Sequence, residues 1–166
     1  MNKFMVTLGV AACLFGANAN AASKVLAFNV DNKPALTMQL PDDWTSKGDA
    51  TKTDIHAGKH EVHIQLWRVA NVKSVQDAIP MVADLIKSEV TEFKAHETKS
   101  ITVAGSAAKH IIGTGSEADD GDPSNAEVYL FSSGGNVFLM CAHGEGTGAS
   151  KVRSSLVKVL ATAKKP

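Results

Sequence analysis

The stretch that decides the fold is residues 126–143, which read AEVYLFSSGGNVFLMCAH. Two apolar runs, residues 126–132 and 136–143, flank a Ser-Gly-Gly turn at residues 133–135. Glycines reach positive φ without strain, so this turn is typical of a β-hairpin. Both runs carry apolar side chains at odd and at even positions, which is typical of strands covered on both faces. The stretch therefore predicts a hairpin at the centre of a sheet.

Other segments have the alternation or the turn residues of shorter strands. In residues 60–69, Val62, Ile64 and Leu66 fall on one face, while the residues between them fall on the other. Trp44 follows a Pro-Asp-Asp turn, and we expect its indole to pack on the sheet. The six predicted strands besides the hairpin are residues 24–30, 35–40, 51–56, 60–69, 94–103 and 109–115.

Two segments have helical spacing of their apolar residues. Residues 74–92 carry Val75, Ala78 and Val82 at intervals of three and four, with Pro80 near the start, where it is expected to bend the helix. Residues 149–164 carry a second apolar stripe before a lysine-rich end. The order of these elements predicts an α+β fold, a mostly antiparallel sheet flanked by helices.

This order of elements, with three short motifs, resembles the PsbP-like family. The motifs are a strand followed by Pro-x-x-Trp at residues 36–44, a Val-Ala-Gly turn at residues 103–105, and the hairpin at residues 128–139. The family includes chloroplast photosystem II accessory proteins, a Ran-binding import factor and exported bacterial proteins. The resemblance implies an α/β/α sandwich and a habit of binding other macromolecules, but it implies no shared catalytic residue.

Composition excludes several classes of protein. The chain has 166 residues, with 17 Lys and Arg against 17 Asp and Glu, so it lacks the strong positive charge of nucleic-acid-binding proteins. With 44% hydrophobic residues and two cysteines, it is neither a disordered chain nor a disulfide scaffold. We therefore expect a globular protein with no nucleic-acid partner.

The N-terminus has the pattern of a signal peptide. Lys3 precedes an apolar run of about a dozen residues, and Ala19-Asn20-Ala21 is an A-x-A cleavage site. We expect residues 1–21 to be removed, leaving residues 22–166 as one domain without a transmembrane segment in the periplasm or outside the cell. The alternative is a lipoprotein, because Val10-Ala11-Ala12-Cys13 resembles a lipobox, although the apolar run continues through Cys13.

After cleavage, the only cysteine is Cys141, so the domain cannot form an internal disulfide. A domain of about 145 residues buries enough surface to be held by its apolar core. Cys141 and His143 lie two residues apart and could form a thiolate–imidazolium pair. The apolar context of Cys141 favours a buried, unreactive thiol instead.

His56, His60 and His63 lie within eight residues, and imidazole is a common metal ligand. His56 and His63 could face each other across the hairpin, whereas His60 and His63 would point to opposite faces of a strand. These histidines are the candidate metal ligands, and solvated hairpin histidines are the competing interpretation.

The loop around residues 117–122 carries Asp119, Asp120 and Asp122, and it is the candidate partner-facing loop. Clustered carboxylates could attract Ca²⁺, but the spacing of an EF-hand is missing. Residues 144–149 match the G-x-G-x-x-A spacing of dinucleotide-binding loops. The second parallel strand that such a site needs is missing, so we expect a strand-to-helix connection, with Thr147 or Ser150 capping the helix.

Together these observations predict an exported, non-enzymatic binding or accessory protein without a cofactor, whose partner is another envelope protein. The oligomeric state is open. The alternative is a periplasmic protein that binds a metal or a small ligand with His56, His60 and His63 or in the groove beside residues 144–148.

Overall fold

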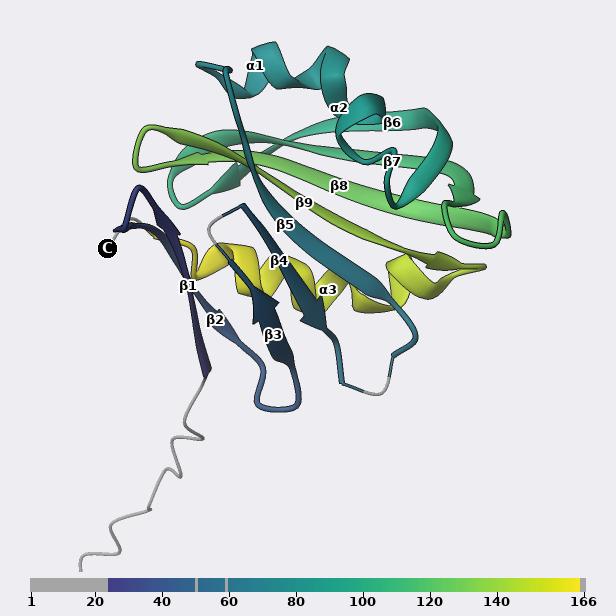
Figure 1. Ribbon diagram of the computed structural model, residues 1–166, viewed down its shortest axis with the longest axis horizontal. Coiled ribbons are helices and arrows are strands. Elements are labelled where there is room, and N and C mark those ends of the chain that lie inside the picture. Colours follow the sequence, from purple (N-terminus) through teal and green to yellow (C-terminus); the bar gives the residue numbers. More distant parts are fainter. Residues whose placement is uncertain (1–23, 50, 59, 165–166) are drawn as a thin grey trace, which may run out of the picture.

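The computed structural model describes residues 24–49, 51–58 and 60–164 of the chain. The predicted signal peptide, its cleavage site and Cys13 lie outside the described residues. A seven-stranded antiparallel sheet has the order β3-β4-β5-β9-β8-β7-β6, and β1 and β2 form a separate antiparallel pair (Figure 1). The strands are β1 (Lys24–Val30), β2 (Lys33–Leu40), β3 (Thr45–Gly48), β4 (Lys52–His56), β5 (His63–Val69), β6 (Val90–Val103), β7 (Ser106–Glu117), β8 (Pro123–Ser133) and β9 (Asn136–Glu145).

The predicted central hairpin is confirmed. β8 and β9 pair from Ser133↔Asn136 to Ser124↔Glu145, and Gly134 and Gly135 both have positive φ in the turn. β9 is the middle strand of the seven, with β5 on its other side. Side chains on both faces of the hairpin are buried, as the two apolar runs predicted.

Helices cover both faces of the large sheet (Figure 1). α3 (Gly148–Ala161) lies on one face together with the β1–β2 pair. Phe28 of β1 meets Phe138 of β9 edge to face, with ring centroids 5.4 Å apart, and Trp44 is buried in the same layer, as expected. The short helices α1 (Val75–Ala78) and α2 (Val82–Leu85) cover the other face. The structure therefore has three layers, helix, sheet and helix, with the sheet in the middle.

The predicted helix over residues 74–92 is wrong in length and continuity. The segment consists of α1, a 3₁₀ turn η1 (Ile79–Met81) and α2, and it ends at Leu85. Pro80 lacks the N–H that a continuous helix needs, so the chain changes to the tighter turn at this point. The predicted helical spacing still places Ala78, Val82 and Ile86 in the core.

The strands predicted at residues 109–115 and 126–132 leave a polar loop of residues 116–125 between them, which is also too long. β7 continues to Glu117 and β8 begins at Pro123, so the connection between them is residues 118–122. Glu117 belongs to the strand and is buried, whereas Asp119 and Asp120 are exposed. β6 begins at Val90 because the second short helix has already ended.

Three segments meet at one end of the large sheet. They are the connection into β5, the turn between β7 and β8, and the connection from β9 into α3. A Cβ at Gly144 would lie 3.1 Å from the carbonyl oxygen of Glu61, a tight contact, so a glycine eases the close approach of the first and third segments. None of the helices in the described residues is long and apolar enough to cross a membrane.

Candidate functional site

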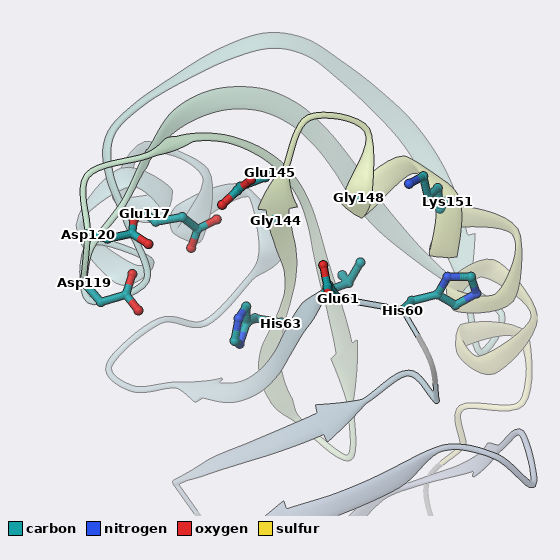
Figure 2. Close-up of a pocket in the computed structure, with 11 residues that line it drawn as sticks. His60, Glu61, His63, Glu117, Asp119, Asp120, Gly144, Glu145, Gly148 and Lys151 are labelled. Carbon is teal, nitrogen blue, oxygen red and sulfur yellow. The ribbon is translucent and has the colours of Figure 1, made fainter.

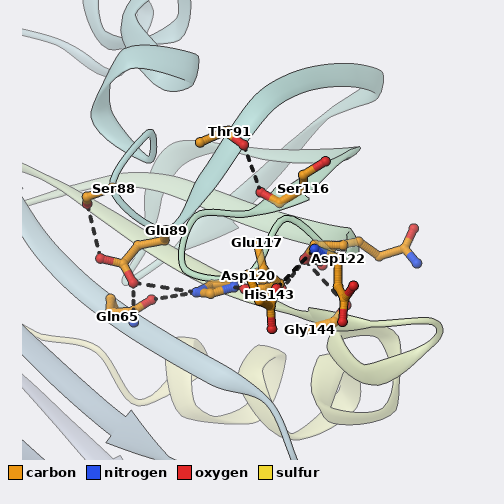
Figure 3. A network of polar contacts seen from close by, with 12 residues as sticks. Gln65, Ser88, Glu89, Thr91, Ser116, Glu117, Asp120, Asp122, His143 and Gly144 are labelled. Atoms are coloured by element: carbon orange, nitrogen blue, oxygen red, sulfur yellow. Dashed lines mark hydrogen bonds and ion pairs between the residues drawn. The ribbon is translucent and has the colours of Figure 1, made fainter.

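His143 is the centre of a buried polar network at this end of the sheet (Figure 3). Its side chain is 3% exposed, and its Nδ1 lies 2.8 Å from Oε2 of Glu117. The hydroxyl of Ser124 donates a hydrogen bond to the other oxygen of Glu117. The imidazole ring of His63 stacks on that of His143, with centroids 5.3 Å apart. Strands β5, β7, β8 and β9 thus all contribute side chains to the network.

A second carboxylate lies on the other side of the imidazole. Glu89, in the connection between α2 and β6, accepts hydrogen bonds from Gln65 Nε2 at 2.9 Å and from Ser88 Oγ at 3.0 Å. Lys52 of β4 forms an ion pair with Glu89 at 2.5 Å. Although burial opposes ionisation, the Lys52 contact and the hydrogen bonds hold the pKa of Glu89 below its usual value. Glu89 is therefore a paired carboxylate.

The orientation of the Gln65 side-chain amide determines which of its atoms contacts His143. Because the amide nitrogen of Gln65 donates to Glu89, its oxygen faces Nε2 of His143 at 3.2 Å. Both ring nitrogens of His143 therefore face acceptor oxygens, and a neutral imidazole has only one N–H. Burial lowers the pKa of His143 because the core solvates an imidazolium poorly, while the neighbouring Glu117 opposes this effect. Only a protonated imidazole has an N–H group for each of the two acceptors, and burial disfavours this charged form.

A groove of about 430 Å³ opens above this network (Figure 2). Its walls come from the three segments that meet at this end of the sheet. Glu117 is shared between the groove and the buried network, and His63 lines the groove while stacking on His143. The lining residues are His60, Glu61, Val62, His63, Glu117, Asp119, Asp120, Gly144, Glu145, Gly148 and Lys151.

The charges of the groove are unevenly distributed. Five lining residues are carboxylates and one, Lys151, is a lysine. In Figure 2, Glu117, Asp119 and Asp120 gather at one end, whereas Lys151 and His60 lie at the other. The groove is thus polar, with an acidic end and a single lysine at the opposite end, within a chain that has no formal net charge.

The three candidate metal ligands are only partly brought together. His56 and His63 pair directly across β4 and β5, as predicted, and so lie on the same face of the sheet. His60 lies before β5, at the lysine end of the groove (Figure 2). Among the described residues, no three His, Cys, Asp or Glu side chains are grouped so that they could hold one metal ion. The metal site stays a prediction that rests on the His56–His63 pair.

The candidate partner-facing loop forms the acidic wall of the groove. Asp119 and Asp120 line it, and the carboxylate of Asp120 accepts a hydrogen bond from the backbone N–H of Asp122 at 3.0 Å, which closes the turn. All three aspartates are exposed. Glu117, which the sequence placed in the same acidic run, points inward to His143 instead, because it ends a strand.

Cys141 is buried, as its apolar context predicted. Burial raises the pKa of its thiol, and the nearby Glu89 and Glu117 raise it further. The two ring nitrogens of His143 contact Glu117 and Gln65. The structure therefore gives Cys141 none of the features of an activated nucleophile.

The glycine-rich segment at residues 144–148 connects β9 to α3, as expected. The prediction of a side-chain cap at its end is only partly right. Thr147 occupies the N-cap position but its hydroxyl makes no capping bond, and Ser150 donates to the carbonyl oxygen of Thr147 at 2.8 Å. After α3, the described chain adds only a bridge between Lys164 and Thr37 of β2, so no second parallel strand forms a dinucleotide site.

A second buried network, which the sequence did not reveal, lies on the other face of the sheet. The carboxylate of Glu127 is 2% exposed and is held by Arg153 of α3, with an N···O distance of 2.6 Å. Tyr129 donates to the same carboxylate at 3.0 Å, and Nε2 of His110 lies 3.1 Å away. Although burial opposes ionisation, these contacts hold the pKa of Glu127 below its usual value. This network ties α3 to the sheet.

No model of a known protein family matches this chain, and no curated protein is similar to it in sequence.

Solved structures do share its fold. PsbP (CyanoP) from Synechocystis matches with a TM-score of 0.54 and 8% identity over 92% of this chain and 99% of that one. LpqN from Mycobacterium tuberculosis, described as involved in cell envelope biogenesis, matches with a TM-score of 0.53 and 13% identity over 86% and 92% of the two chains.

A third match, a protein from Bacteroides thetaiotaomicron, has a TM-score of 0.54 and 14% identity. The match covers 79% of this chain and 45% of that one, so this chain corresponds to less than half of the Bacteroides protein. At such low identities these likenesses establish the fold, an α+β fold of the PsbP-like type, and they confirm the resemblance found in the sequence.

Proposed function

From its PsbP-like fold we propose that this chain is an exported accessory protein of the cell envelope, which binds another envelope protein and catalyses no reaction itself. The M. tuberculosis protein with this fold is described as involved in cell envelope biogenesis, which supports an envelope role here. The signal-peptide pattern at residues 1–21 supports export.

The groove at the His63 end of the sheet is the observation that carries the proposal. It is open and polar, and it is formed by loops on a rigid sheet, which is where binding residues are commonly found. Its base is fixed, since the buried network holds Glu117 through His143 and Ser124. The acidic end, at Asp119 and Asp120, suits a basic side chain of the partner.

Site-specific photo-crosslinking in the producing cells tests this proposal. We expect a photoreactive residue at position 119 to cross-link one envelope protein, and the same residue at position 76 to give no such product. Gln76 is an exposed residue of α1, which follows the opposite end of β5, so it serves as a control for nonspecific capture. Equal cross-linking from both positions, or none from either, would overturn the proposal.

A charge-matched pair of variants tests the acidic wall. Asp119→Asn with Asp120→Asn removes two groove charges, and the amide oxygen introduced at position 120 can still accept the turn hydrogen bond. Asp42→Asn with Asp84→Asn removes two exposed charges elsewhere. With the photoreactive residue moved to position 61 in both backgrounds, we expect the product to decrease only in the first. A similar decrease in the second would mean that overall charge, and not the groove, determines binding.

A second candidate function, metal binding, is favoured by the direct pairing of His56 with His63. Calorimetric titration with Zn²⁺ tests it, with His56→Ala plus His63→Ala as the variant and His96→Ala as the control. His96 is an exposed histidine on β6, at the far side of the sheet. Loss of binding in the first variant alone would support a metal site, and identical titrations of both would exclude it.

A further inference from the structure

β6 is the edge strand at one end of the seven-stranded sheet, and its outer edge pairs with no other strand among the described residues. Its middle is exposed on both faces, from Lys94 to Ser100. α2 packs near the beginning of the strand, where Ala83 of the helix and Phe93 of the strand line one surface pocket. The free part of the edge therefore lies beyond Lys94, and its backbone N–H and C=O groups are available to another strand.

The regular part of this edge begins after two bulges. The pairing of β6 with β7 shifts between Thr91 and Lys94 and again between Ala95 and Glu97, and from Glu97 to Val103 it is regular. Bulges commonly protect an edge against pairing, so the unprotected stretch is this second half of the strand. It carries two charges, Glu97 and Lys99, which form an exposed ion pair at 2.9 Å.

Hydrogen-bonding geometry restricts how this stretch could pair with itself. In an antiparallel pair, two opposed residues either both point their backbone N–H and C=O groups toward the other strand or both point them away from it. These directions alternate along a regular strand, so when a strand pairs with its own copy, the sequence numbers of two opposed residues differ by an even number. The two-fold axis that relates the two copies must then lie at one residue, which opposes the same residue of the second copy. Centred on Glu97 or on Lys99, the pairing opposes like charges. Centred on Ser100, the pairing places Lys99 opposite Ile101 and Glu97 opposite Val103, so neither charge has a charged residue opposite it.

A two-fold axis at Thr98 gives a different result. It places Glu97 opposite Lys99 of the second copy, and Lys99 opposite its Glu97. The intrachain ion pair then becomes part of a cluster of four alternating charges on one face of the joined strands. Cross-strand pairs of opposite charge stabilise a sheet, whereas like charges opposed across strands destabilise it. Among the registers centred on residues 97 to 100, this one alone opposes unlike charges.

We propose that β6 pairs edge to edge with β6 of a second copy of this chain, about a two-fold axis at Thr98, and so joins two seven-stranded sheets. The interface is independent of the groove, which lies at the end of the sheet formed by β5, β7 and β9. One dimer therefore presents two grooves. The paired strands also place the exposed Thr98 side chain against Thr98 of the second copy.

Complementary charge variants of the purified protein test the register. Glu97→Lys makes both charges of the edge positive, and Lys99→Glu makes both negative. By sedimentation velocity, we expect the native protein to dimerise with rising concentration and each variant alone to stay monomeric. An equimolar mixture of the two variants is expected to form heterodimers, because every opposed pair is then complementary. Recovery in the mixture also shows that both variants are folded.

The double variant Glu97→Lys with Lys99→Glu exchanges the two charges and should dimerise as the native protein does. Lys158→Glu, the same charge reversal at an exposed position of α3, is the control and should leave dimerisation unchanged. A native protein that stays monomeric at every concentration would overturn the proposal. Single variants that dimerise normally, or a mixture that stays monomeric, would overturn the register.

Discussion

Burial lowers the pKa of His143, so this residue links folding to pH. The unfolded chain, in which a histidine has a pKa of about 6.5, binds the proton more readily than the folded one. The stability that neutral His143 contributes is therefore complete above about pH 6.5 and is lost as the pH falls toward the lower pKa of the folded state. The groups facing the ring are Glu117, Glu89, Gln65 and His63, and the first two oppose the shift.

We expect the free energy of unfolding to decrease between about pH 7.5 and pH 5, where exposed carboxylates stay ionised. In His143→Gln this decrease should be smaller, because the titrating group is gone. Urea denaturation, monitored by tryptophan fluorescence, measures the free energy of unfolding at each pH. His96→Gln, a change at an exposed histidine that contacts Thr114, is the control and should keep the native slope. An unchanged slope in His143→Gln would contradict this account.

Cys141 is a second residue whose chemistry follows from burial. Its thiol is inaccessible, and its raised pKa keeps it protonated, so alkylating reagents should not modify it in the folded protein. We expect iodoacetamide at neutral pH to leave the peptide that contains Cys141 unmodified, as measured by mass spectrometry, and to modify it fully in denaturant. Modification of the native protein at the rate of a free thiol would show that this core opens readily.

At the scale of elements, α3 is attached to the sheet by a charged contact as well as by its apolar stripe. Arg153 pairs with the buried carboxylate of Glu127. Removing the guanidinium leaves that carboxylate with only the contacts from Tyr129 and His110. Because a buried charged group that loses its partner costs more than a neutral one, we expect Arg153→Met to destabilise the protein by about 2 kcal/mol.

Thermal or chemical denaturation measures this loss, with Lys158→Met as the matched control. Lys158 is an exposed residue of α3, and its replacement by Met also removes a positive charge. This replacement should change the free energy of unfolding by no more than about 0.5 kcal/mol. Equal effects of the two changes would mean that Arg153 acts only through the net charge of the helix.

The elements that the sequence predicted well are those whose pattern is local. The β8–β9 hairpin follows from two apolar runs around Gly134 and Gly135, and α3 follows from one stripe. The segment at residues 74–92 failed because Pro80 interrupts a spacing that is otherwise helical. Proline itself was the available signal: a proline beyond the first turn argues for a short helix followed by a new start.

The candidate site was less accessible to sequence reasoning because its partners are distant along the chain. His143 meets Glu117, 26 residues away, and Gln65, 78 residues away. Their contact depends on the register of four strands, which no local pattern specifies. The loop aspartates and His63 could be found because they cluster in sequence, whereas Glu89 lies inside the segment predicted as a helix, where a single carboxylate has nothing to mark it.

At the scale of the whole molecule, the β1–β2 pair is attached to the rest of the fold by hydrogen bonds and by apolar packing. The sequence predicted both strands, but their separation from the large sheet depends on packing. β2 joins the C-terminal end through hydrogen bonds with Lys164 and Thr162, and Ser133 donates to the carbonyl oxygen of Ala35 at 3.1 Å. Phe28 packs on Phe138 of the central strand. One apolar layer thus includes the pair, α3 and the large sheet.

Because this layer is shared, we expect the β1–β2 pair and the large sheet to unfold together. Phe28→Ala removes a fully buried ring and should lower the free energy of unfolding by about 3–5 kcal/mol. Val25→Ala, at an exposed position of the same strand, should change it by no more than about 0.5 kcal/mol. In Phe28→Ala, calorimetry should still show a single transition, with the calorimetric and van't Hoff enthalpies equal. A separate early transition would mean that the β1–β2 pair is an independent unit, and that Phe28 stabilises only its attachment to the sheet.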